Sequence, residues 1–217
     1  MKPGALLDLG VREFGAVWAL QKQLVAQRQA DEIPDTLVLV EHPEVITLGR
    51  RQSSRANVLS DEIPLFEIER GGDVTYHGPG QLVGYPIVKL DEPERDLHLY
   101  LRNLEEALIR VCAEIGLAGA RRDGLTGVWL GERKVASIGI AVRRWVTLHG
   151  FALNVSTELA RFSAINPCGL DAAVMTSLSE AAGRPIALDA LKPRVAAHLG
   201  DALGRSFTSP APPAPGR

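Results

Sequence analysis

The middle of the chain constrains the fold most, because it is rich in strand-forming segments and holds only one long helical pattern. Apolar segments of strand length follow one another between residues 36 and 155, separated by Gly, Pro and polar residues. The helical pattern covers Leu97 to Ile115, and further helices are expected at residues 11–28 and 188–203. Because helices do not alternate with the strands, the sequence predicts an α+β fold in which mixed β-sheets are flanked by helices.

Turn-forming residues set the boundaries of the individual elements. Glu132 and Arg133 separate two apolar segments and predict a hairpin, in which Gly131 eases the turn. Pro86 lies inside a strand pattern, which predicts an edge strand or a bulge. Pro193 should break its helix or mark where the helix begins. The expected strands cover residues 5–10, 36–41, 44–50, 65–70, 81–90, 126–131, 134–142 and 146–155.

Composition excludes several classes of protein. Hydrophobic residues make up 46% of the chain, which is enough for a sizeable core, and the net charge of -2 gives no basic excess for binding nucleic acid or a membrane surface. Two cysteines and an N-terminus without a continuous apolar segment predict a cytoplasmic protein in a reducing compartment. The Pro- and Ala-rich residues 209–217 are expected to be disordered.

A glycine-rich segment, RGGDVTYHGPGQLVG at residues 70–84, joins two expected strands. Its glycines lack the dinucleotide-binding spacing, no GxxxxGK[ST] phosphate loop occurs, and the spacing of histidines and cysteines predicts no metal site. A plain turn also uses glycine and proline, and that interpretation stays open. Arg70, Asp73, Tyr76 and His77 give the segment more hydrogen-bonding capacity than a turn needs, which makes it a candidate binding loop.

The two cysteines have different surroundings in the sequence. Cys112 belongs to the apolar stripe of the long helix, where a cysteine behaves as a small hydrophobic residue. Cys168 lies between a proline and a glycine in a polar loop, which suits either a chance loop residue or a reactive thiol. A nucleophilic cysteine needs a partner that favours the thiolate, and His77, His149 and Lys134 are all candidates. The sequence spacing does not decide among them.

Four motifs in a fixed order resemble the lipoyl(octanoyl) transferase family: RGGDVTYHGPGQLVGYPI, GERKVASIGIAV, HGFALNV and INPCGL. The resemblance implies a single catalytic domain over residues 1–208, with the fold shared by biotin protein ligases and lipoate ligases. It also implies that Cys168 is the nucleophile and Lys134 its partner. The substrate contacts that it implies are Arg70, Gly71, Gly72, Asp73, Val74, Thr75, Tyr76, His77, Ser137, Ile138, Gly139, Gly150, Phe151 and Ala152.

The resemblance further implies the reaction and its partners. An octanoyl group would move from octanoyl-acyl carrier protein, through a thioester on Cys168, to a lysine on a lipoyl domain of an oxoacid dehydrogenase E2 subunit or on the glycine cleavage H protein. Because a thioester donor is already activated, no ATP and no cofactor are expected. Three alternatives stay open: an ATP-dependent lipoate or biotin protein ligase of the same fold, a non-catalytic module that binds a carrier protein, and a cysteine hydrolase that pairs Cys168 with a histidine.

Overall fold

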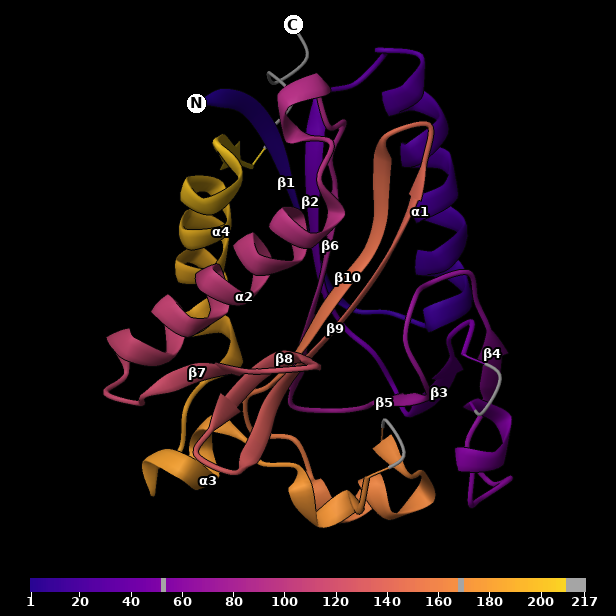
Figure 1. Ribbon diagram of the computed structural model, residues 1–217, viewed down its shortest axis with the longest axis vertical. Coiled ribbons are helices and arrows are strands. Elements are labelled where there is room, and N and C mark those ends of the chain that lie inside the picture. Colours follow the sequence, from indigo (N-terminus) through magenta and orange to yellow (C-terminus); the bar gives the residue numbers. More distant parts are fainter. Residues whose placement is uncertain (52–53, 168–169, 210–217) are drawn as a thin grey trace, which may run out of the picture.

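The computed structural model describes residues 1–51, 54–167 and 170–209. In this part of the chain eight strands form one sheet in the order β11-β1-β2-β6-β10-β9-β8-β7, and β4-β3-β5 form a second, smaller sheet (Figure 1). β1 runs parallel to both of its neighbours, β2 and β11, whereas the other neighbours in the large sheet are antiparallel. The expected α+β class with mixed sheets and flanking helices is therefore confirmed.

The boundaries of the elements follow most of the expected segments. The strands are β1 (Lys2–Val11), β2 (Asp35–Glu41), β3 (Val45–Leu48), β4 (Leu65–Glu67), β5 (Thr75–His77), β6 (Gln81–Ile87), β7 (Gly119–Arg122), β8 (Leu125–Leu130), β9 (Arg133–Arg143), β10 (Val146–Asn154) and β11 (Arg205–Thr208). The helices are α1 (Phe14–Gln29), α2 (Leu97–Glu114), α3 (Leu178–Ala182) and α4 (Leu188–Leu203). The long helix and the hairpin between β8 and β9 lie where the sequence predicts them.

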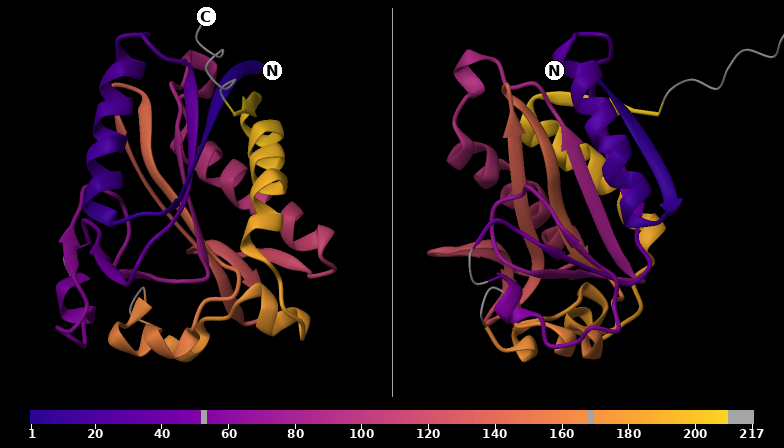
Figure 2. Two further views of the ribbon diagram at one scale, coloured as in Figure 1. Left: turned by 180° about the vertical axis from the view of Figure 1, so that it is seen from behind. Right: turned by 90° about the vertical axis from the view of Figure 1, so that its right-hand side faces the viewer.

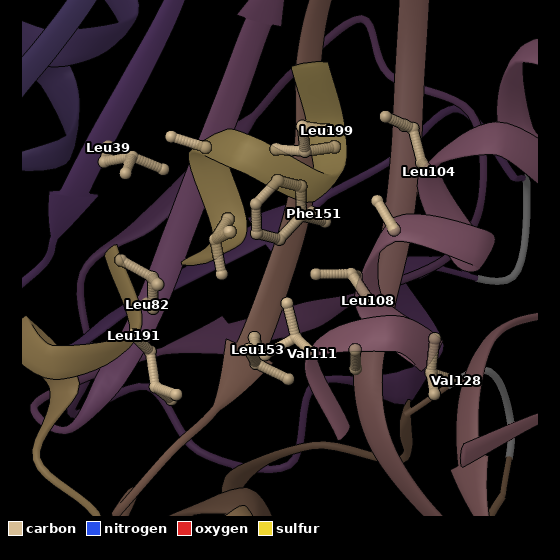
Figure 3. Close-up of a cluster of buried hydrophobic side chains, with 14 of the residues drawn as sticks. Leu39, Leu82, Leu104, Leu108, Val111, Val128, Phe151, Leu153, Leu191 and Leu199 are labelled. Atoms are coloured by element: carbon tan, nitrogen blue, oxygen red, sulfur yellow. The ribbon is translucent and has the colours of Figure 1, made fainter. Parts of the chain in front are cut away.

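Helices cover both faces of the large sheet, and the alternation of side chains along its strands explains why. Leu37 and Leu39 of β2 pack in one core with α2 and α4, whereas Val38 and Val40 pack in another core with α1. The views in Figures 1 and 2 agree that α1 lies on one side of the sheet and that α2 and α4 lie on the other. Figure 3 shows residues of α2 and α4 gathered around Phe151 of β10.

Two proline-based expectations are wrong. β6 is a central strand, because β2 and β10 both pair with it, although its pairing with β10 ends at Gly84. The ring of Pro86 faces β10, since a Cβ at Gly150 would stand 2.7 Å from the proline Cδ. The N–H that proline lacks therefore falls where β6 and β10 are no longer paired. Helix α4 begins at Leu188 and continues through Pro193, which removes only one hydrogen bond near its N-terminal end.

The sequence analysis missed β5, β7, α3 and β11. Each has three to five residues, which is too short to show a hydrophobic period. β11 is held by its pairing with β1, a contact between the two ends of the described chain. No helix in the described ranges has the length and apolar character needed to cross a membrane.

Candidate active site

A cavity forms beside β9, at the point where β8 stops pairing with it. β8 pairs with β9 only as far as Ala136, while β9 continues to Arg143 beside β10. The glycine-rich loop takes the place of β8 along this edge, since the N–H of Gly71 donates to the carbonyl oxygen of Ile140 at 2.8 Å. Between the loop, the strands and the start of α2 lies a cavity of about 320 Å³. That volume falls within the range of small-molecule sites, roughly 300–1,000 Å³.

The structure brings most of the predicted site residues to this cavity. Pro167, which precedes Cys168 in the sequence, lines it, whereas Cys168 itself lies outside the described residues. Tyr76 does not line it, because β5 alternates and directs this side chain away, where its hydroxyl donates to Glu44 Oε1 at 2.9 Å. The predicted residues that line the cavity are Lys134, Arg70, Gly71, Gly72, Asp73, Val74, Thr75, His77, Ser137, Ile138, Gly139, Gly150, Phe151 and Ala152.

Apolar side chains that the sequence analysis did not assign to a site complete the walls. Leu97 and Leu101 belong to the apolar stripe of α2, but here the stripe extends beyond the core and reaches the cavity. Leu97 is 41% exposed, which would be unusual for a core leucine and suits a cavity wall. The sequence did offer one signal for these two leucines, because the apolar stripe of α2 is longer than the part of it that packs in the core. The other missed residues include Phe14, Arg51, Ile68, Tyr85, Leu125 and Ile140. His149, which the sequence named only as a candidate partner of the cysteine, also lines the cavity.

Lys134 is unusually buried for a lysine, with only 4% of its surface exposed. Its Nζ lies 5.6 Å from the centroid of the Trp129 ring, which is a favourable position for a cation. Gly127 makes room for the side chain, because a Cβ at that position would stand 2.6 Å from Lys134 Cε. The backbone carbonyl of Lys134 accepts a hydrogen bond from the N–H of Thr176 at 3.0 Å, which holds this part of β9.

The histidines of the cavity are neutral near pH 7. Burial lowers the pKa of His77 to about 3, and the nearby His42 and Arg70 act in the same direction. Burial likewise lowers the pKa of His149 to about 4, although Glu69, whose carboxylate is 3.6 Å from His149 Nε2, opposes the shift. These rings therefore add hydrogen-bonding atoms to the cavity without adding charge.

Polar residues fix the shape of the glycine-rich loop. Arg70 donates to the carbonyl oxygen of Thr47 at 2.9 Å and to its hydroxyl at 3.1 Å. Burial opposes the ionisation of Asp73, but hydrogen bonds from the Val74 N–H and from Asn57 outweigh it and hold the pKa of this carboxyl below its usual value. Gly72 has a φ of +88°, a conformation that disfavours other residues and lets the loop turn over the cavity.

The described residues contain no cluster of three or more His, Cys, Asp or Glu side chains that could hold a metal ion. What the arrangement offers is an apolar cavity with a lysine in its wall, next to the segment that leads into Cys168. Such a site can hold an aliphatic chain and bring its polar end toward a charged amine.

Comparison with known proteins agrees with this geometry. The model of the lipoyl protein ligase A/B catalytic domain matches residues 14–200. Among solved structures, a bipartite lipoate protein ligase from Thermoplasma acidophilum superposes with a TM-score of 0.73 at 18% identity, covering 97% of this chain and 87% of that one. A biotin protein ligase from Aquifex aeolicus gives a TM-score of 0.52 at 16% identity, covering 94% and 70%. At these identities the two structures show the fold alone.

Relatives of known name are much closer in sequence. An octanoyltransferase from Geobacter metallireducens is 53% identical over 210 residues, which is 96% of this chain and 98% of the relative. An octanoyltransferase from Mycobacterium tuberculosis is 49% identical over 199 residues, covering 90% of this chain and 85% of the relative.

The chain therefore belongs to the lipoyl protein ligase A/B catalytic domain family. Within that family its similarity places it among the octanoyltransferases, so it is an acyltransferase that moves octanoyl groups in protein lipoylation. The family resemblance seen in the four sequence motifs is confirmed.

Proposed function

We propose that the chain transfers an octanoyl group in two steps through Cys168. In the first step the thiolate of Cys168 would attack the thioester of octanoyl-acyl carrier protein and release the carrier thiol. In the second step a lysine amine of the acceptor would attack the Cys168 thioester, form an amide and release the thiol. The observation that carries the proposal is the apolar cavity whose wall includes Lys134 and Pro167, the residue before Cys168.

Lys134 has two roles in this proposal. Its ammonium would favour the thiolate of Cys168, since an unperturbed cysteine has a pKa of about 8.5 and forms little thiolate at neutral pH. In the first step the ammonium would give its proton to the departing carrier thiolate, and the neutral amine left on Lys134 would then take the proton that the acceptor amine must lose. Its burial beside Trp129 supports both roles, because a buried side chain is held in one position and its charge is little screened by solvent.

The octanoyl chain would lie along β9 and β10 under the glycine-rich loop. Gly139 and Gly150, which pair across these strands, have no side chains and so let neighbouring backbone come close to the floor of the cavity. A Cβ at Gly139 would stand 3.0 Å from the carbonyl oxygen of Gly71, and one at Gly150 would stand 2.2 Å from that of Gly84. We propose that the predicted contact residues bind the acyl chain here, with Phe14, Leu97 and their apolar neighbours completing the wall.

The substrates in general are an acyl group on a carrier and a lipoyl domain. The specific partners that we propose are octanoyl-acyl carrier protein as the donor, and E2 lipoyl domains and the glycine cleavage H protein as acceptors. Arg51 supports an acidic donor, because it lines the cavity while 60% of its side chain is exposed.

Intact-mass measurement tests this proposal directly. After incubation with octanoyl-acyl carrier protein and no acceptor, the enzyme should gain one octanoyl group, and addition of a lipoyl domain should remove it. Cys168→Ala should abolish the adduct and the transfer. Cys112→Ala is the matched control and should keep both, because Cys112 is buried in the core, where burial raises its pKa to about 12. Acylation that persists in Cys168→Ala and disappears in a folded Cys112→Ala would contradict the assignment.

The ligase alternative predicts a different product. An ATP-dependent ligase would form AMP from ATP and free octanoate, whereas the proposed transferase needs neither. AMP release that depends on octanoate would therefore favour the ligase, whose fold this chain shares.

A further inference from the structure

A chain of buried hydrogen bonds leads from the glycine-rich loop to the strand that carries Lys134. His77 Nδ1 lies 2.7 Å from Gln81 Oε1, and Gln81 Nε2 donates to Asn154 Oδ1 at 2.9 Å. Asn154 Nδ2 in turn donates to the carbonyl oxygen of Thr176 at 2.9 Å. The N–H of Thr176 then donates to the carbonyl oxygen of Lys134. All five residues are buried.

Two backbone carbonyls fix the direction of every bond in this chain. The carbonyl of Thr176 can only accept, so the atom of Asn154 that faces it is the amide nitrogen, and its oxygen faces Gln81. Gln81 Nε2 also donates to the carbonyl of Tyr76 at 3.2 Å, which leaves its oxygen to face His77. His77 Nδ1 must therefore carry the hydrogen, and Nε2 of this neutral ring is an acceptor.

A second chain of hydrogen bonds begins at Asp73, another polar residue of the glycine-rich loop. Asn57 Nδ2 donates to Asp73 Oδ2 at 3.0 Å, and the carbonyl oxygen of Asn57 accepts the N–H of Asn166 at 2.8 Å. Asn166 lies two residues before Cys168, and Thr176 lies eight residues after it. The loop is thus connected to the described chain on both sides of residues 168–169, by Asp73 on one side and by His77 on the other.

We propose that Asp73 and His77 are positioning residues which, through these two chains, hold the segments that flank residues 168–169 against the strand of Lys134. This inference rests on the proposed function, because it takes Cys168 as the nucleophile and Lys134 as its partner. The attraction between an ammonium and a thiolate falls with distance, so a loose flank weakens the effect of Lys134 on the thiol. Both charges must be held in place for the cysteine to react at neutral pH.

Asn154 and Asn57 give the sharpest test, because neither lines the cavity and each occupies the middle of one chain. The measurement is the alkylation rate of Cys168 against pH, together with kcat and KM for octanoyl-acyl carrier protein. In Asn154→Ala and in Asn57→Ala the alkylation midpoint should move to higher pH. Each unit of that shift slows alkylation at pH 7 roughly tenfold. The value of kcat should fall, while KM for the donor stays close to that of the parent.

Thr147→Val is the matched control. Thr147 is a buried polar residue of β10, like Asn154, but it bonds to the backbone of Pro86 and belongs to neither chain. This variant should melt at a lower temperature and keep the parent's alkylation midpoint. If Asn154→Ala does not fold, Asn57→Ala tests the second chain alone, because Asn57 is only partly buried.

The outcomes separate this inference from the proposed function. Folded Asn154→Ala or Asn57→Ala protein with the parent's alkylation midpoint and kcat would overturn the positioning role of the corresponding chain, even if Cys168 is acylated normally. Failure of octanoyl-acyl carrier protein to acylate Cys168 in the parent would overturn the proposed function instead. An upward shift in Thr147→Val as large as in Asn154→Ala would show that general loosening of β10 is enough, and would also overturn the inference.

Discussion

Two buried polar clusters lie in different parts of the molecule and differ in kind. The site cluster, which comprises His77, Gln81 and Asn154, consists of neutral groups beside the cavity. The Arg205 cluster, which comprises Arg205, Asp35 and Glu94, consists of charged groups where β11, β2 and the segment before α2 meet. Arg205 Nε donates to Asp35 Oδ2 at 2.9 Å, and its remaining nitrogens contact Glu94 and the backbone of Lys89 and Leu203.

The difference shows that burial of charge alone does not identify a functional site. Arg205, with 2% of its surface exposed, is more deeply buried than Lys134, with 4%. Yet Arg205 does not line the cavity, and its partners lie in β2, in the segment before α2 and at the end of α4. The site cluster has no formal charge, but it connects a cavity-lining histidine to the strand of the proposed catalytic lysine. The Arg205 cluster should therefore control stability and the site cluster reactivity.

The largest expected effect is at Lys134, which belongs to neither cluster. Lys134→Ala should lower transfer by roughly 10²–10⁴-fold, the contribution typical of a proton-transfer residue, and should raise the alkylation midpoint of Cys168. Lys134→Arg keeps the charge, but a guanidinium does not release a proton near neutral pH, so it should restore thiolate formation better than turnover. The measurement is the alkylation rate against pH beside the transfer rate. An unchanged midpoint in Lys134→Ala would mean that Lys134 is not the partner of Cys168, and His77 and His149 should then be tested.

The next largest effect concerns stability. Arg205→Leu should lower the free energy of unfolding by about 3–5 kcal/mol, because it leaves the carboxylates of Asp35 and Glu94 buried or half-buried without their cation. Transfer per folded molecule should stay the same. Arg122→Leu is a control, since Arg122 forms a mainly exposed pair with Glu132 and its loss should lower stability by less than about 1 kcal/mol. Urea unfolding measures both. A fall in kcat in Arg205→Leu, measured on folded protein, would contradict the view that the Arg205 cluster affects stability alone.

The two buried histidines of the cavity, His77 and His149, and Glu94 of the Arg205 cluster should lose their contributions to stability in different ranges of pH. Burial lowers the pKa of His77 to about 3 and that of His149 to about 4, so their neutral forms stabilise the fold above pH 6.5 and this contribution is lost as the pH falls toward 4. Burial opposes the ionisation of Glu94, but Arg205 outweighs it and the pKa falls to about 2. The contribution of Glu94 is therefore present above pH 4.5 and is lost between pH 4.5 and 2.

Two substitutions check these ranges in urea unfolding at several pH values. His149→Asn removes one titrating group and suits the left-handed backbone at this position, where φ is +59°, so the decline between pH 6.5 and 4 should become shallower. Glu94→Gln should flatten only the decline below pH 4.5. If either substitution changes the other range instead, the assignment of groups to ranges is wrong.

Sequence periodicity predicted the layers of this fold better than its site. The stripe of α2 and the alternation along β2 reflect burial against one face, and burial leaves a repeating pattern that a single sequence can show. The contact of Asn154 with Thr176 joins residues 22 positions apart. The contact of Lys134 with Thr176 joins strand β9 to the segment before α3, and no local pattern relates these two parts of the chain. The motifs identified the glycine-rich loop and Lys134, whereas Phe14, Leu97 and the connecting amides became visible only once the strands were placed.

The smallest expected effect is that of deleting the C-terminal tail, which begins just after β11 and the Arg205 cluster. Residues 210–217 lie outside the described residues, and Ser209 is exposed after the last strand. We predict that deletion of Ser209–Arg217 changes the free energy of unfolding by less than about 0.5 kcal/mol, because a Pro- and Ala-rich segment offers little to pack. Deletion from Arg205 onward should be severe, since it removes both β11 and the cation that Asp35 and Glu94 share. Thermal melting of the two truncated chains separates the cases. A large drop after the shorter deletion would mean that the tail packs on the domain, and the domain boundary would then lie beyond residue 208.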